Sequence, residues 1–65
     1  MTIKELRTGC GITQKHIINE MRQDGFRITR SVYSEKERGI RHFTAKEIQW
    51  LCVRFDADIK SITLV

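Results

Sequence analysis

Residues 44–55 read TAKEIQWLCVRF and contain the clearest helix signal in the chain. Thr44 and Glu47 have the spacing of a capping box, in which two side chains satisfy free N–H groups at the start of a helix. Apolar residues then recur at i, i+3, i+4 and i+7, as Ile48, Leu51, Cys52 and Phe55. Such a stripe is typical of a helix that buries one face. The sequence therefore predicts a helix here, with Leu51 at the centre of the core.

Outside this stretch, helix signals recur at short intervals. The residues that can cap a further helix or turn are Thr2, Thr13, Thr29 and Asp58. Glycines near positions 9–11, 25 and 39 are suited to end the first three segments. The tail at 62–65, ITLV, is β-branched and fits either a last turn or a short strand. We therefore predict an all-α domain of four or five short helices.

Length and composition exclude several classes of protein. With 65 residues the chain has room for one domain, over 1–65, and none for a large catalytic architecture. No apolar run is long enough to span a membrane, and proline is absent. Cys10 and Cys52 do not form a metal or disulfide motif, so we expect buried, reduced cysteines in a cytoplasmic protein. His16 and Glu20 are spaced to share a metal but lack a third ligand. We expect no metal, cofactor, small-molecule ligand or membrane contact.

The positive charge of the chain is concentrated in its first two thirds. The formal net charge is +4. Residues 1–44 contain nine basic and five acidic side chains, whereas residues 45–65 contain three of each. A one-sided basic surface attracts polyanions such as nucleic acids. The alternative is a solvated face that only keeps a small protein soluble.

Three stretches resemble the Cro/phage-repressor (XRE-like) class of helix-turn-helix DNA-binding domains. Residues 11–21, GITQKHIINEM, resemble the opening of the second helix in that family, and residues 28–39, ITRSVYSEKERG, resemble its recognition helix. Residues 41–62, RHFTAKEIQWLCVRFDADIKSI, resemble its fourth and fifth helices. The resemblance implies a compact lambda-repressor-like fold of four or five helices. It also implies a small phage or prophage-type transcriptional regulator, acting as a repressor, that binds double-stranded palindromic operators as a homodimer.

The resemblance also implies which residues meet DNA. Those expected to read bases are Arg30, Ser31 and Ser34. Those expected at the DNA backbone are Gln14, Lys15, Arg27, Arg38, Arg41 and His42. Arginine suits guanine because it can donate two hydrogen bonds to O6 and N7. The alternative is that Arg30 is a solvated cation and Gln14 a simple first-turn residue.

The sequence departs from the family pattern between the second and third helices. Met21 is followed by RQDGFRI, which makes the connection about five or six residues longer than the family's short turn. Arg22 and Arg27 are then expected near DNA phosphates, or Phe26 in the gap between helices. In addition, Ile18 stands where the family has a small residue and Lys36 where it has an aliphatic one. The lengthened turn bears on the register of the base-reading residues.

A partner surface is expected away from the core stripe. On a helical wheel Trp50 points away from Leu51 and lies beside Val53. With Leu64 and Val65, these residues are predicted to form an exposed dimer or partner surface. The alternative function is therefore a protein-interaction module on the same scaffold, an antirepressor or co-regulator. We do not expect an enzyme, because no catalytic pair is present in the sequence.

Overall fold

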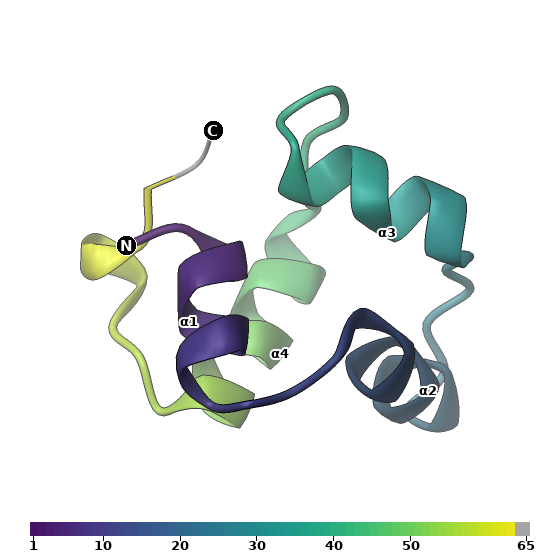
Figure 1. Cartoon of the computed structure of the whole chain (residues 1–65), viewed down its shortest axis with the longest axis horizontal. Coiled ribbons are helices and arrows are strands. Elements are labelled where there is room, and N and C mark those ends of the chain that lie inside the picture. Colours follow the sequence, from purple (N-terminus) through teal and green to yellow (C-terminus); the bar gives the residue numbers. More distant parts are fainter. Residues whose placement is uncertain (64–65) are drawn as a thin grey trace.

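Figure 1 shows the computed structural model, which describes residues 1–63 as short helices joined by brief loops. The elements are α1 (Ile3–Gly9), α2 (Gln14–Gln23), α3 (Arg30–Glu37), α4 (Ala45–Phe55) and the 3-10 turn η1 (Ile59–Ser61). None of residues 1–63 lies in a strand, so the all-α prediction is confirmed for the part of the chain that the structure describes. Leu64 and Val65 lie outside the described residues.

Each helix begins at the threonine predicted to cap it. The side-chain oxygens of Thr2, Thr13, Thr29 and Thr44 each accept a hydrogen bond from the backbone N–H three residues later. Thr2 with Glu5 and Thr44 with Glu47 form complete capping boxes. Asp58 caps η1 by accepting from the N–H of Lys60, two residues later. Each cap contributes about 1 kcal/mol, which is a sizeable share of the stability of a small domain. The capping side chains therefore determine where the helices start.

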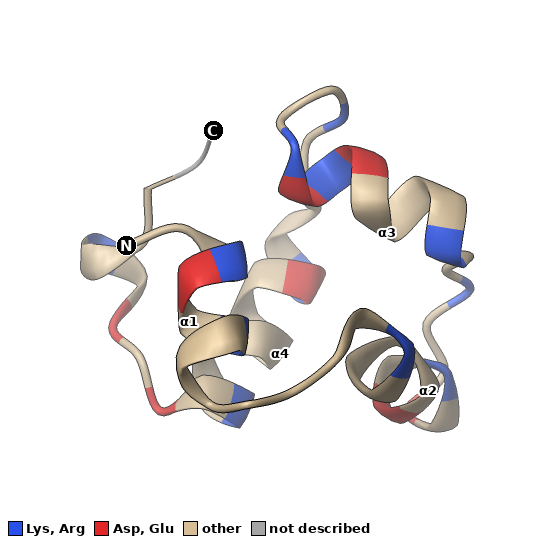
Figure 2. Cartoon of the chain, viewed as in Figure 1, with Lys and Arg blue, Asp and Glu red and all other residues tan. Residues whose placement is uncertain are grey.

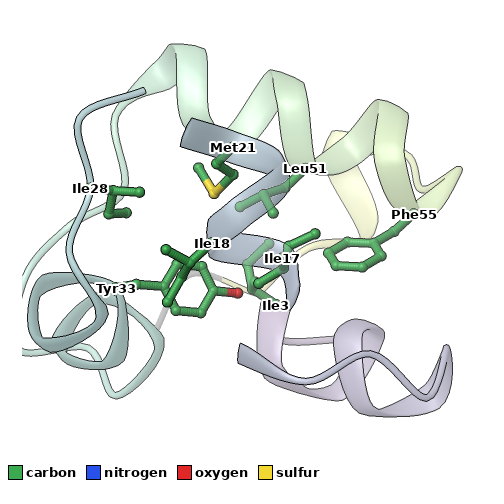
Figure 3. Packing of buried hydrophobic residues seen from close by; sticks show 8 residues of the cluster. All are labelled: Ile3, Ile17, Ile18, Met21, Ile28, Tyr33, Leu51 and Phe55. Atoms are coloured by element: carbon green, nitrogen blue, oxygen red, sulfur yellow. The ribbon is translucent and has the colours of Figure 1, made fainter. Parts of the chain in front are cut away.

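The core lies where the inner faces of α1, α2, α3 and α4 meet, as Figure 3 shows. Its fully buried side chains are Ile17, Met21, Tyr33 and Leu51. Of the stripe predicted on α4, Ile48, Leu51 and Phe55 are buried, and Cys52 is half-buried at its edge. The prediction that Cys10 is buried is wrong, because this residue caps the C-terminus of α1 in an exposed turn.

The lengthened connection between α2 and α3 is folded against the core. Gly25 has φ +97°, a left-handed conformation that glycine adopts readily and that turns the chain after α2. Ile28 is buried in the core, and the ring of Phe26 meets that of Trp50 edge to face, with 6.2 Å between the centroids. The extra residues therefore add two apolar side chains to the packing.

An ion pair joins the end of α3 to the start of α4. The Lys36 ammonium donates to both carboxylate oxygens of Glu47, at 2.6 and 2.8 Å. Glu47 also accepts from the backbone N–H of Thr44 at 2.8 Å, as part of its capping box. The charge of Lys36 is thus neutralised where its side chain is largely covered.

Candidate nucleic-acid interface

Five of the predicted DNA-contacting residues line one shallow hollow at α3 and the start of α2. The hollow is lined by Gln14, Arg30, Ser31, Ser34, Glu35 and Arg38. Arg30, Ser31 and Arg38 are exposed, and Ser34 is half-buried. All three predicted base-reading residues are therefore on one outward face, beside two residues predicted at the DNA backbone.

The inner face of α3 determines which residues face outward. Tyr33 and Glu37, one helical turn apart, are both buried. Tyr33 also packs edge to face on Phe43, with 5.9 Å between the ring centroids. This side of α3 is held in the core, and Arg30, Ser31 and Ser34 lie beside it, on the flank of the helix that lines the hollow. Tyr33 is therefore a core residue of α3.

A buried ion pair fixes α3 against α1. The guanidinium of Arg7 donates to Glu37 through Nε at 2.7 Å and Nη2 at 3.2 Å, and Nη1 donates to the Ile12 carbonyl at 2.7 Å. Burial opposes ionisation of Glu37, but the hydrogen bond from Arg7 helps to outweigh it and lowers the pKa of the carboxyl. Sequence reasoning missed Arg7, because nothing near it in the sequence marks it as buried.

Gln14 takes part in the same network. Its side-chain Nε2 donates to Glu37 Oε1 at 3.1 Å, which leaves the amide's second hydrogen and its oxygen at the edge of the hollow. Gln14 is also the first residue of α2, where backbone N–H groups of the first turn lack partners within the helix. Gln14, which is predicted to contact the DNA backbone, is therefore held in place by the buried Glu37.

Most cations around the hollow have no acidic partner. Arg7 is bound to Glu37, and Lys36 to Glu47. Arg41 lies at a longer distance from Glu35, 3.5 Å from Nε to Oε2. Among residues 1–63, no ion pair involves Lys15, Arg22, Arg27, Arg30 or Arg38. Figure 2 shows basic segments at both ends of α3. This face therefore has a surplus of free positive charge.

The lengthened connection contributes a second basic hollow beside the start of α3. Its lining residues are Arg22, Gly25, Phe26, Arg27, Ile28 and Thr29. Arg22 and Arg27 are both exposed. The structure therefore places Arg27 beside the first turn of α3 but not in the same hollow as Arg30.

Besides Arg27, three predicted residues lie apart from the hollow, and one unpredicted residue lies in it. Lys15 is exposed on the first turn of α2. Arg41 and His42 are exposed in the loop after α3 and line a different small cavity, shared with Thr2 at the start of α1. Glu35 lines the main hollow and was not predicted there. Its position four residues after Ser31, on the same face of α3, was readable from helical spacing.

The prediction that Trp50 is exposed is wrong. Trp50 is half-buried, its indole Nε1 donates a hydrogen bond to Asp24, and Phe26 packs against its ring. The residues of the lengthened connection cover this side of α4. Val53 is 83% exposed, as expected. The two other residues predicted for this surface, at 64 and 65, lie outside the described part of the chain.

Within residues 1–63, no group of three potential metal-ligating side chains occurs, and none of the helices is long and apolar enough to cross a membrane. His16 Nε2 lies 2.7 Å from Glu20 Oε2, in an exposed pair within α2. Comparisons with protein-family models, with curated proteins and with solved structures find no match to this chain.

Proposed function

We propose that this protein is a small transcriptional regulator that binds double-stranded DNA through a lambda-repressor-like helix-turn-helix formed by α2 and α3. The observation that carries the proposal is the outward row of Arg30, Ser31 and Ser34 on a helix whose inner side is buried. An α-helix is about 10–12 Å across with its side chains and fits the major groove, which is about 12 Å wide. α3 is the helix that enters the groove.

Base recognition is assigned to residues of α3 between Arg30 and Glu35. Arg30 is the first residue of this helix and has no ion-pair partner among residues 1–63, so its guanidinium is free to bind guanine O6 and N7. The Ser34 hydroxyl can donate or accept. Glu35 adds an acceptor that suits the amino group of cytosine. A carboxylate at this position also repels phosphate, which favours α3 lying in the groove rather than along the backbone.

Backbone contacts are assigned to cations on both sides of α3. Lys15 and the N–H groups at the start of α2 face one strand, together with Gln14. Arg27 lies beside the start of α3, and Arg38 and Arg41 lie at and after its end. Each phosphate neutralised in this way releases counterions, which makes the affinity dependent on salt. A protein bound in this way at a promoter represses by excluding polymerase.

The decisive experiment is DNA binding by the full chain, measured by mobility shift at two salt concentrations. The probes are a random-sequence pool and fragments of genomic DNA. We expect binding to both at low salt, and retention of a subset of genomic fragments at higher salt. Lys60→Ala is the matched control, because Lys60 is an exposed cation on η1, away from the hollow, and its loss should leave binding unchanged. Absence of binding to any probe at low salt contradicts the proposal.

A second candidate function, an antirepressor or co-regulator that binds another protein, is favoured by one observation. Val53 projects from α4 beside the half-buried ring of Trp50, in a groove that shares no lining residue with the hollow at Arg30. Substitution of Arg30 and Arg38 by alanine separates the two functions. It abolishes regulation that acts through DNA and leaves regulation through this face intact.

A further inference from the structure

The lengthened connection between α2 and α3 separates its positive charges from its negative charge. Arg22 and Arg27 are exposed and line the second basic hollow, beside the start of α3. Asp24 stands between them in the sequence, but it lines the groove between α2 and α4 instead. Among residues 1–63, no ion pair joins Asp24 to either arginine. Neighbours in the sequence therefore belong to two different hollows, according to the sign of their charge.

Trp50 of α4 holds Asp24 on its side of the connection. The indole Nε1 donates a hydrogen bond to the Asp24 carboxylate, and the ring packs on Phe26, the residue that lines both hollows. An indole N–H can only donate, so it binds a carboxylate and offers nothing to an arginine. Asp24 is two residues from Arg22 and three from Arg27. A carboxylate released by Trp50 would therefore be within reach of both guanidinium groups.

The hollow that contains the two arginines suits a phosphate group. Of the four hollows described above for residues 1–63, it is the one whose lining has cations and no carboxylate. The backbone N–H groups of Arg27, Ile28 and Thr29 have no backbone acceptor within those residues. Arginines and free N–H groups are the donors that proteins present to DNA phosphates. The buried side chain of Ile28 anchors this segment, so the donors are held in place before a ligand arrives.

We propose that Trp50 is a positioning residue for DNA binding, which acts by holding the Asp24 carboxylate away from Arg22 and Arg27. The hollow of the two arginines then stays positive and binds a phosphate of the DNA backbone. Trp50 itself does not touch DNA in this arrangement, because its partner Asp24 lines the groove on the α4 side. The inference rests on the proposed function, since it assigns the phosphate to DNA. It makes α4 a contributor to the affinity that α2 and α3 provide.

The test is a double-mutant cycle between Trp50 and Asp24, with binding of the full chain to a random-sequence duplex measured at several salt concentrations. Trp50→Phe keeps an aromatic ring against Phe26 and removes the N–H, so the carboxylate is released. We expect several-fold weaker binding and a salt slope lowered by about one unit, because the carboxylate neutralises one arginine. Asp24→Asn should change little in the parent, whose carboxylate is already held away. In the Trp50→Phe background it should restore most of the affinity and of the slope.

The hydrogen bond can be checked without DNA, because Trp50 is the only tryptophan of the chain. Its single indole N–H resonance is followed by NMR in the parent and in Asp24→Ala. We expect faster exchange of this proton with solvent in the variant, because its acceptor is gone. Equal exchange rates would show that Asp24 does not bind Trp50 in solution and would overturn the inference.

A second background shows whether Trp50 acts through the arginines. In a chain with Arg22→Ala and Arg27→Ala, Trp50→Phe should have no further effect on binding, because no guanidinium remains there to be neutralised. Thermal melting by circular dichroism identifies a loss of stability, which Asp24→Asn would not restore. With a parent that binds DNA, three results overturn the inference: parent-like binding by Trp50→Phe, no restoration by Asp24→Asn, or an equal gain from Asp24→Asn in both backgrounds. A parent that does not bind DNA contradicts the proposed function, and this inference with it.

Discussion

Arg7 of α1 and Glu37 of α3 lie 30 residues apart in the sequence and form a two-pronged ion pair inside the protein. Their side chains are 9% and 1% exposed. Through the Ile12 carbonyl and the Gln14 amide, the same pair also contacts the segment that leads into α2. One buried interaction therefore sets the relative positions of the helix that carries Arg30 and the helix that carries Gln14.

We expect either partner to be costly to remove alone, because the other is left as an uncompensated buried charge. Arg7→Met or Glu37→Leu should each lower the free energy of unfolding by about 3–5 kcal/mol. The double variant should lose much less than the sum, since two apolar side chains then fill the site. Urea denaturation of the three variants measures the coupling. Additive losses would show that the two charges do not depend on each other.

Acid should destabilise the protein, in part through Glu37. Hydrogen bonding lowers the pKa of this carboxyl below the ordinary value of 4.5, although burial opposes the shift. The unfolded chain therefore binds the proton more readily, so this stabilisation is complete above about pH 4.5 and is lost as the pH falls through the folded-state pKa. Thermal melting from pH 7 down to pH 3 should show a steeper fall in Tm for the parent than for the Arg7→Met/Glu37→Leu variant. Equal slopes would show that Glu37 does not contribute to the loss of stability in acid.

Leu51 should be the most sensitive position on α4. Its side chain is fully buried, and a leucine-to-alanine change in a core costs about 2–5 kcal/mol through lost contacts and the cavity left behind. Gln49→Ala is the matched control, because Gln49 is exposed on the same helix. Leu51→Ala should lose most of its helical circular dichroism at ambient temperature, whereas Gln49→Ala should melt as the parent does. A Tm for Leu51→Ala within a degree or two of the parent would place Leu51 outside the core.

Arg30 and Arg41 should affect DNA binding in different ways. Arg30→Ala should cost about 1–3 kcal/mol on the best site and flatten the preference at one base pair, because Arg30 begins α3 and faces outward. Arg41→Ala should weaken binding to all sequences alike and lower the salt slope by about one unit. Titrations on specific and random duplexes at several salt concentrations distinguish the two.

The lengthened connection between α2 and α3 bears on the register of α3, that is, on which of its residues face the bases. If Arg30→Ala lowers the salt slope and leaves base preference intact, Arg30 contacts a phosphate and another residue of the hollow reads the base. Ser34→Ala, examined on the same duplexes, then shows whether the reading position has moved by one turn along α3. No change in affinity for either arginine variant would contradict DNA binding through this face.

Local features of the fold could be predicted from the sequence, and distant contacts could not. The caps at Thr2, Thr13, Thr29 and Thr44 each depend on a side chain and an N–H three residues away, so short-range spacing was sufficient. The resemblance to the Cro/phage-repressor class likewise grouped Arg30, Ser31 and Ser34, and these three residues line one hollow. By contrast, the burial of Arg7 depends on Glu37, and the covering of Trp50 depends on Asp24 and Phe26. These partners lie on other segments of the fold, so the spacing of residues within α1 or α4 does not reveal them.

The double role of Glu47 has a consequence for the loop between α3 and α4. Its carboxylate accepts from Lys36, the penultimate residue of α3, and from the N–H of Thr44, the cap of α4. The segment between them is thus closed at its base by non-covalent bonds, much as a cross-link closes a ring. Part of the conformational entropy of these residues is therefore lost when the protein folds, and less remains to be lost when Arg41 meets a ligand. The loop is therefore preorganised before Arg41 meets a ligand.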